Sequence, residues 1–243
     1  MLELLLIASL TCVATGLGVI PVLLLGERAA AIRPALLGVA AGVMTVAAIA
    51  GLLLPALDEG TASEVGLGAL AGVGFLAAAR SWIEHRGVGG PELAGATRRT
   101  AILVFAVLLV HSLPEGFAIG TAYASETAGL GLFVVVAIAI QNIPEGTSVA
   151  IPMQASGDST ARQFWAATAT SIPQPIGAAI AFVLVEEITS LLPVSFGFAA
   201  GAMLALVAVE LVPQGWRDDR RLTGVGTFVG AAAMLGFSSL LGV

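Results

Sequence analysis

Residues 101–123 read AILVFAVLLVHSLPEGFAIGTAY, an apolar run in which Glu115 is the one acidic residue. The run is long enough to cross the roughly 30 Å of hydrocarbon in a bilayer as one α-helix. Its apolar residues do not alternate with a period of two, as the strands of a membrane barrel do. The stretch therefore predicts a membrane-spanning helix with a carboxylate near its middle.

The composition of the whole chain also indicates an all-α membrane protein. Of the 243 residues, 58% are hydrophobic and 11% are charged, against roughly 25% charged in a soluble domain. The mean hydropathy is +1.00. The net charge of −6 argues against a nucleic-acid partner. Cys12 is the only cysteine, so no disulfide can form within the chain.

Charges, glycines and prolines divide the chain into eight apolar spans, which we expect to form one transmembrane domain over residues 1–243. The predicted spans are 2–25, 35–57, 65–84, 100–123, 129–152, 163–185, 190–212 and 223–242. The first span has Glu3 and no basic segment before it, so we expect a retained helix and not a signal peptide.

Arginines and acidic residues fall on opposite sides of this arrangement. One side holds all ten arginines: Arg28, Arg33, Arg80, Arg86, Arg98, Arg99, Arg162, Arg217, Arg220 and Arg221. The loops of the other side hold acidic residues and no basic one: Asp58, Glu59, Glu64, Glu126, Glu186 and Glu187. The positive-inside rule makes the arginine side cytoplasmic, so both termini are expected outside.

Two pairs of similar segments within the sequence predict an inverted repeat. Residues 40–44 read AAGVM and residues 199–203 read AAGAM, and a proline follows each, at Pro55 and Pro213. The third and eighth spans share one glycine spacing: Gly66, Gly68 and Gly72, and Gly224, Gly226 and Gly230. Small residues also recur simply because they let membrane helices approach closely. With the repeat, the spans form a 3+2+3 arrangement, a pattern typical of secondary transporters.

The central pair of spans carries matching polar motifs. Residues 111–116 read HSLPEG and residues 141–146 read QNIPEG. An ionised carboxylate at the bilayer centre costs about 2.5–3.5 kcal/mol on insertion scales, so two at matching depth need an explanation. His111 and Glu115 share one helix face, as do Gln141 and Glu145. Together they offer the nitrogen and oxygen ligands that suit Zn²⁺, Fe²⁺, Mn²⁺, Co²⁺ or Cd²⁺.

Each motif alone has a plainer explanation. A histidine in a membrane helix is often hydrogen-bonded to a neighbour, and a buried glutamate can be protonated. The repetition of Pro-Glu-Gly at one depth favours the metal site. Pro114 and Pro144 are expected to kink their helices and to free a carbonyl group each. Gly116 and Gly146 are expected to permit close packing.

The stretches HSLPEGFAIG (111–120) and QNIPEGTSVA (141–150) resemble the paired signatures of the ZIP (Zrt/Irt-like) metal transporters, commonly written HNxPEG. The glutamine that opens the second stretch is similar to the GufA-type branch. The resemblance implies transport of zinc or a related divalent ion toward the cytoplasm, in a multi-pass protein of the plasma membrane. It also implies an elevator-like movement of spans one, four, five and six.

The resemblance implies two metal sites. The first would use His111, Glu115, Gln141 and Glu145, and the second would use Ser112, Glu115, Asn142, Glu145 and Gln174. Ser112 stands where the family usually has asparagine, and Gln174 where many members have glutamate. A missing carboxylate weakens a site for a dication, so we expect one strong site and a weak or absent second one. Pro173 and Pro175 should break their helix.

Other features are left with two interpretations each. Glu210 resembles a family glutamate at the inner exit, but a carboxylate reaching toward the interface explains it equally well. A passive divalent-cation channel and an intramembrane metalloenzyme are the alternatives in function, although the chain lacks an H-E-x-x-H motif. We expect the ion as substrate, no catalytic cofactor, and the lipid bilayer as partner. A homodimer is compatible with the sequence.

Overall fold

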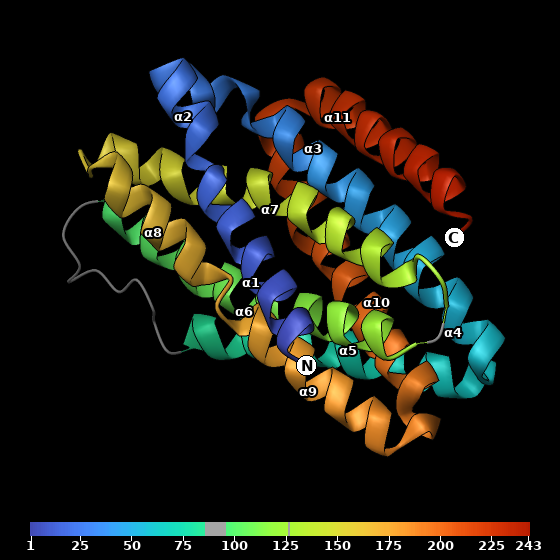
Figure 1. Cartoon of the computed structure of the whole chain (residues 1–243). Coiled ribbons are helices and arrows are strands. Elements are labelled where there is room, and N and C mark those ends of the chain that lie inside the picture. The colour runs from blue at the N-terminus through green and yellow to red at the C-terminus, as the bar shows by residue number, and fades with distance from the viewer. Residues whose placement is uncertain (86–95, 126) are drawn as a thin grey trace.

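The computed structural model describes residues 1–85, 96–125 and 127–243, and the side chains within these ranges except at 84 and 96–108. Every regular element in these ranges is helical (Figure 1). The helices are α1 (Leu2–Leu17), α2 (Val19–Leu25), α3 (Ala29–Ala48), α4 (Leu54–Glu59), α5 (Ala62–His85), α6 (Ala96–Ala124), α7 (Leu130–Ala155), α8 (Thr160–Thr170), α9 (Pro173–Glu187), α10 (Leu192–Leu206) and α11 (Val212–Leu241).

Five helical stretches of the described chain are long and apolar enough to cross a membrane. Two of them, Leu2–Glu59 and Thr189–Leu241, are 58 and 53 residues long. One crossing needs about 20 residues, so each of these stretches has the length for two. The other three stretches are Ala62–Ile83, Leu130–Ala155 and Thr160–Glu187.

Both long stretches are interrupted where a turn would be needed. In the first, the short 3₁₀ turn Gly26–Arg28 separates α2 from α3, and Gly26 has a positive φ of 57°. In the second, Asp219 has an extended backbone inside α11 (φ −160°, ψ 109°). Its Oδ1 atom accepts hydrogen bonds from the backbone N–H groups of Arg221 and Leu222. Asp219 thus caps the helix that follows and divides α11 into two.

Three further breaks differ from the predicted spans. The first span is not one helix, because α1 ends at Leu17 and α2 begins at Val19. A π-turn, Ile49–Leu53, separates α3 from α4, and a second one, Val207–Leu211, separates α10 from α11. Each π-turn ends two residues before a proline, and proline cannot donate the backbone hydrogen bond that a regular helix would use there.

Glycine lets two helix pairs pack at backbone distance. α3 packs along α11, and α5 packs along α10. A Cβ atom added at Gly42 would overlap the backbone of Thr227, and one added at Gly201 would overlap the backbone of Ala69. Side-chain-free contacts of this kind are typical of membrane helix interfaces, where close backbone approach supplies most of the packing energy.

α6 and α7 lie in the middle of the bundle. They contact each other, α1 and α8, while α6 also contacts α9 and α10, and α7 also contacts α3 (Figure 1). The largest buried side chains include Phe133 of α7 and Ile119 of α6, which belong to one continuous apolar core. Polar side chains in the middle of α6 and α7 are therefore shielded by protein on several sides.

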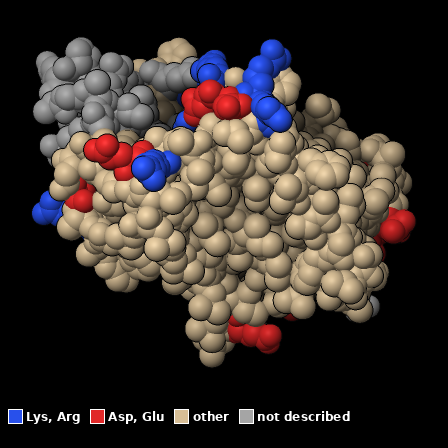
Figure 2. Space-filling model, turned by 90° about the horizontal axis from the view of Figure 1, so that it is seen from above, with Lys and Arg blue, Asp and Glu red and all other residues tan. Residues whose placement is uncertain are grey.

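The described arginines gather toward one end of the molecule. On the face displayed in Figure 2, the blue arginines lie toward the top and left of the view, while its lower and right edges show red acidic residues and no arginine. The predicted loop at 85–99 falls largely outside the described residues, and so do Arg86, Glu126 and the side chains of Arg98 and Arg99.

Candidate metal centre

Two carboxylates are buried together in the middle of the bundle. Glu115, from α6, has no exposed surface, and Glu145, from α7, is 3% exposed. Gln141, one helical turn before Glu145 on α7, hydrogen-bonds to Glu115, so the two carboxylates lie on facing sides of α6 and α7. Like charges this close repel each other in a poor solvent for charge, so the pair needs either protons or a cation to be stable.

Two amide side chains hold Glu115. Gln141 Nε2, from α7, donates to Glu115 Oε1 at 2.7 Å, and Gln174 Nε2, from α9, donates to Glu115 Oε2 at 2.6 Å. Both oxygens of this carboxylate therefore have a partner from a different helix. The contacts fix the carboxylate in place and fix which end of each amide faces it.

Three potential ligand atoms next to this carboxylate have no hydrogen-bond partner. Among the side chains that the structure describes, the buried nitrogen and oxygen atoms without a partner are His111 Nδ1, Gln141 Oε1 and Glu145 Oε1. A buried polar atom left without a partner costs about 1–3 kcal/mol, and such atoms often mark a site for a water molecule or an ion. All three belong to the set predicted for the first metal site.

The residues predicted for a second site form hydrogen bonds with one another and with neighbouring helices. Ser112 donates to the backbone carbonyl of Thr170 at 2.9 Å. Asn142 Nδ2 donates to the carbonyl of Thr11 at 2.8 Å, and Asn142 Oδ1 accepts from Gln174 Nε2 at 3.3 Å. Gln174 Oε1 in turn accepts from the Thr11 hydroxyl at 2.7 Å. The amide hydrogens of Asn142 and Gln174 thus point at oxygen atoms within this cluster.

Local sequence explains how these side chains come together. α8 ends at Thr170 and α9 begins at Pro173, so the predicted break before the two prolines is confirmed. α6 and α7 continue as helices through Pro114 and Pro144. A Cβ atom at Gly116 would overlap the backbone of Gln174, and one at Gly146 would overlap the carbonyl of Thr15. The glycines predicted to permit close packing therefore bring α9 to α6 and α1 to α7.

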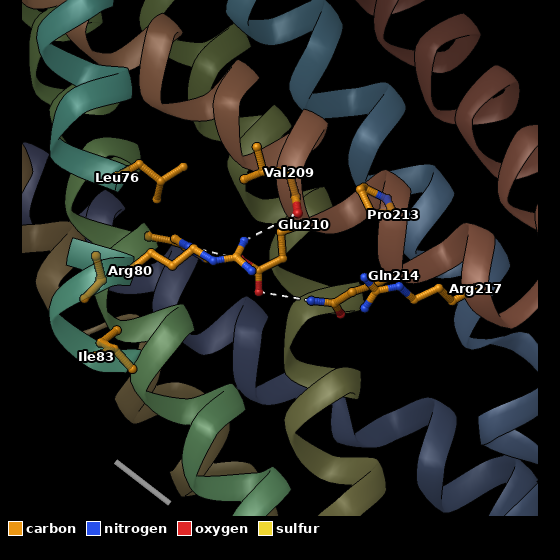
Figure 3. A pocket seen from close by; sticks show the side chains of 10 residues that line it. Leu76, Arg80, Ile83, Val209, Glu210, Pro213, Gln214 and Arg217 are labelled. Carbon is orange, nitrogen blue, oxygen red and sulfur yellow. Dashed lines mark hydrogen bonds and ion pairs between the residues drawn. The ribbon is translucent and has the colours of Figure 1, made fainter. Parts of the chain in front are cut away.

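Glu210 lies on the π-turn Val207–Leu211, and its side chain is 17% exposed. Its Oε2 atom is 3.5 Å from His111 Nε2, so His111 lies between the carboxylate pair and Glu210. His111 also lines a cavity of about 270 Å³ that Arg80, Glu210, Gln214 and Arg217 share (Figure 3). The predicted residue at the inner exit is thus in contact with the candidate centre.

In the described part of the chain, no three His, Cys, Asp or Glu side chains converge closely enough to hold a metal ion by themselves. His111 Nε2 faces Glu210, while Gln141 presents its N–H and not its oxygen to Glu115. A complete ligand set would require His111 to turn and the Gln141 amide to rotate.

Several residues that the structure places at the centre were not predicted from the sequence. Thr11 bonds to Gln174, and Thr15 bonds to Ser171 at 2.6 Å. Both threonines lie four residues apart in the apolar helix α1, a spacing that puts them on one helix face. That polar face was the available signal. No such sequence pattern pointed to Arg80 or Gln214, because each lies near the end of a predicted apolar span, where polar residues are expected.

Comparison with known proteins shows the family of the chain. Residues 84–238 match the family model described as ZIP zinc transporter. The chain is 35% identical to zinc transporter ZIPB of Bordetella bronchiseptica over 94% of its own length and 78% of that protein. It is 33% identical to zinc transporter GufA of Myxococcus xanthus, over 87% of this chain and 88% of that one.

A putative zinc transporter of Arabidopsis thaliana is 34% identical over 84% of this chain, which spans about a third (33%) of that longer protein. The matched family region contains both Pro-Glu-Gly motifs, the helix break before Pro173 and Glu210. The chain thus belongs to the ZIP family, whose members are transporters and not enzymes.

Proposed function

We propose that this multi-pass membrane protein carries a divalent metal ion, most readily Zn²⁺, across the plasma membrane toward the cytoplasm. The observation that supports this most is the set of unpartnered atoms on His111, Gln141 and Glu145 beside the buried Glu115. Nitrogen and carboxylate ligands together suit zinc. The zinc transporters among its relatives support the same substrate.

In this proposal the centre holds one ion. The ion is bound by His111, Glu115, Gln141 and Glu145 after small side-chain rotations. Gln174 donates two hydrogen bonds, to Glu115 and Asn142, where a second ion would otherwise bridge carboxylates. Because the ion neutralises two acidic groups that are costly to bury as anions, its binding releases protons that the empty site holds.

We further propose eight membrane crossings over residues 1–243, with both termini outside. Four apolar single crossings come from α5, α6, α7 and the α8–α9 pair, and the two long stretches supply two crossings each. The 3+2+3 inverted repeat is supported by the matched helix pairs, α3 with α11 and α5 with α10. It is also supported by the two π-turns, each preceding a proline.

The helix contacts favour a moving bundle of α1, α6, α7, α8 and α9. Within this bundle, α1 and α6 contact each other and each of the other three helices, whereas the most extensive contacts of α3 and α5 are with α11 and α10. An elevator-like shift of the bundle would carry the ion between the two sides. His111 links the moving bundle to the remaining helices, because it lies on α6 and contacts Glu210, which lies between α10 and α11. A homodimer is not required for the site, since one chain supplies every ligand.

The test is zinc uptake into proteoliposomes, together with equilibrium zinc binding to the purified protein. Glu115→Ala and Glu145→Ala should each abolish saturable uptake and lower zinc affinity by at least about tenfold, since one lost charged ligand costs more than about 1.4 kcal/mol. Glu187→Ala removes an exposed carboxylate at the end of α9 and should leave both unchanged. Wild-type uptake in both site variants would refute the centre.

Two alternatives make different predictions in the same assay. A passive channel would give a rate that rises linearly with zinc concentration, whereas a carrier saturates. Transport in the outward direction would appear as faster zinc loss from loaded vesicles than entry into empty ones. An intramembrane metalloenzyme has no support, because the family consists of transporters.

A further inference from the structure

The cavity of about 270 Å³ joins the candidate metal centre to the arginine end of the molecule. His111 lines this cavity, and it also lines the small adjoining space bounded by Glu115. An ion that leaves the centre toward the arginine end would therefore pass along the cavity wall. We call this cavity the exit cavity.

Glu210 is the carboxylate of the exit cavity, and its side chain is held from two sides. His111 Nε2 lies 3.5 Å from Oε2, and Gln214 Nε2 donates to Oε1 at 3.1 Å. The orientation of the Gln214 amide is fixed in turn, because Arg33 Nη2 donates to Gln214 Oε1 at 3.0 Å. Arg33 also pairs with Asp218.

Arg80, from α5, reaches into the same cavity. Figure 3 shows its side chain extending toward Val209 and Glu210, and its Nη1 atom contacts the Val209 carbonyl at 3.5 Å. Arg80, Glu210 and His111 all line this one cavity. The guanidinium therefore brings a positive charge into the cavity that holds the Glu210 carboxylate and the His111 imidazole.

A carboxylate and an imidazole this close are a good pair of zinc ligands. Two such ligands at an exit would hold the ion and slow its release. A permanent positive charge beside them offsets this attraction, because it stabilises the free carboxylate and repels a dication. Arginine suits this role since its guanidinium keeps its charge under all physiological conditions.

We propose that Arg80 competes with the transported ion for Glu210, so that the exit cavity passes the ion on and does not retain it. This inference rests on the proposed function. It makes Arg80 a positioning residue whose effect is on the release of the ion and not on its capture at Glu115 and Glu145.

The proposal is tested by measuring zinc uptake kinetics and zinc binding of the Arg80→Gln variant. The same measurements are made on three comparison variants: Arg80→Lys, Glu210→Gln and the double variant Arg80→Gln/Glu210→Gln. We expect Arg80→Gln to lower both Vmax and KM by about threefold, the size typical of one partly exposed charge interaction. It should also hold a second zinc ion per chain at saturation. Arg80→Lys should restore wild-type values. Removing Glu210 in the double variant should abolish the second ion and raise Vmax again.

The outcomes are separable. A fall in Vmax with unchanged or raised KM, not reversed by Glu210→Gln, would mean that Arg80 has only a structural role and would overturn the proposal. Wild-type kinetics and one bound ion in Arg80→Gln would overturn it as well. If the wild-type protein neither binds nor transports zinc, the proposed function itself fails.

Discussion

At the scale of single residues, the candidate metal centre could be predicted because charged residues are rare inside apolar runs. Glu115 and Glu145 are the acidic residues in the middle of two apolar runs, and both are buried in the fold. Spacing predicted which side chains share a helix face. It could not predict their directions, because these depend on contacts between helices. The pairing of His111 with Glu210, and of the Gln174 amide with Glu115, therefore came from the structure alone.

The first residue-scale prediction concerns Gln174. Gln174→Glu removes the N–H donor to Glu115 and adds a third carboxylate to the buried pair. We expect the number of zinc ions bound per chain at saturation to rise from one to two, measured by equilibrium dialysis with metal analysis. We also expect lower thermal stability without zinc, because like charges then face each other unpaired.

Gln154→Glu is the matched control, because Gln154 lies near the end of α7, away from the carboxylate pair. It adds the same charge and should leave the stoichiometry at one. A single bound ion in Gln174→Glu would contradict the view that the glutamine amide replaces a second ion.

At the scale of helices, the sequence predicted most boundaries within a few residues, because charges and prolines end apolar runs. The break at Gly18 and the two π-turns were not predicted. Gly18 is adjacent to the backbone of Gly146 and Thr147, a tertiary contact that no local pattern reveals. A π-turn depends on how a helix accommodates a missing donor, and proline alone does not specify whether the helix kinks, breaks or widens.

A helix-scale prediction follows from the close approach of α6 and α9. Gly116→Ala places a methyl group into the backbone of Gln174, so the two helices must separate. We expect the distance between Gln174 and Glu115 to grow and the protein to lose about 1–3 kcal/mol of stability, as overpacked interiors do. Zinc uptake should fall strongly, while thermal unfolding in detergent should still be cooperative.

Gly66→Ala provides the control for this change, since a Cβ atom at Gly66 meets no heavy atom within 4 Å. It should unfold and transport like the wild-type protein. Equal stability and uptake in the two variants would show that the α6–α9 contact is not needed for the site.

At the scale of the whole molecule, the arginines are the feature that orients the protein. Their segregation was predicted from span counting, and on the face that Figure 2 displays the arginines lie apart from the acidic residues of the opposite edge. The exit cavity opens among Arg80 and Arg217, so the orientation also decides the direction in which the ion leaves. A wrong orientation would turn the proposed importer into an exporter without any change in the metal centre.

Cysteine labelling tests the orientation and the number of crossings together. In a Cys12→Ser background, which removes the one native thiol, Glu59→Cys, Ser156→Cys and Glu187→Cys each introduce a cysteine at an exposed position. Three proposed crossings, by α5, α6 and α7, separate Glu59 from Ser156, and one more, by α8 and α9, separates Ser156 from Glu187. We therefore expect a membrane-impermeant maleimide added to intact cells to label positions 59 and 187. Position 156 should react only after permeabilisation, because the positive-inside rule places the arginine end in the cytoplasm.

Two outcomes would contradict this arrangement. Labelling of position 156 alone in intact cells would mean that the protein has the opposite orientation, and the proposed direction of transport would then be reversed. Labelling of all three positions would contradict the proposed topology.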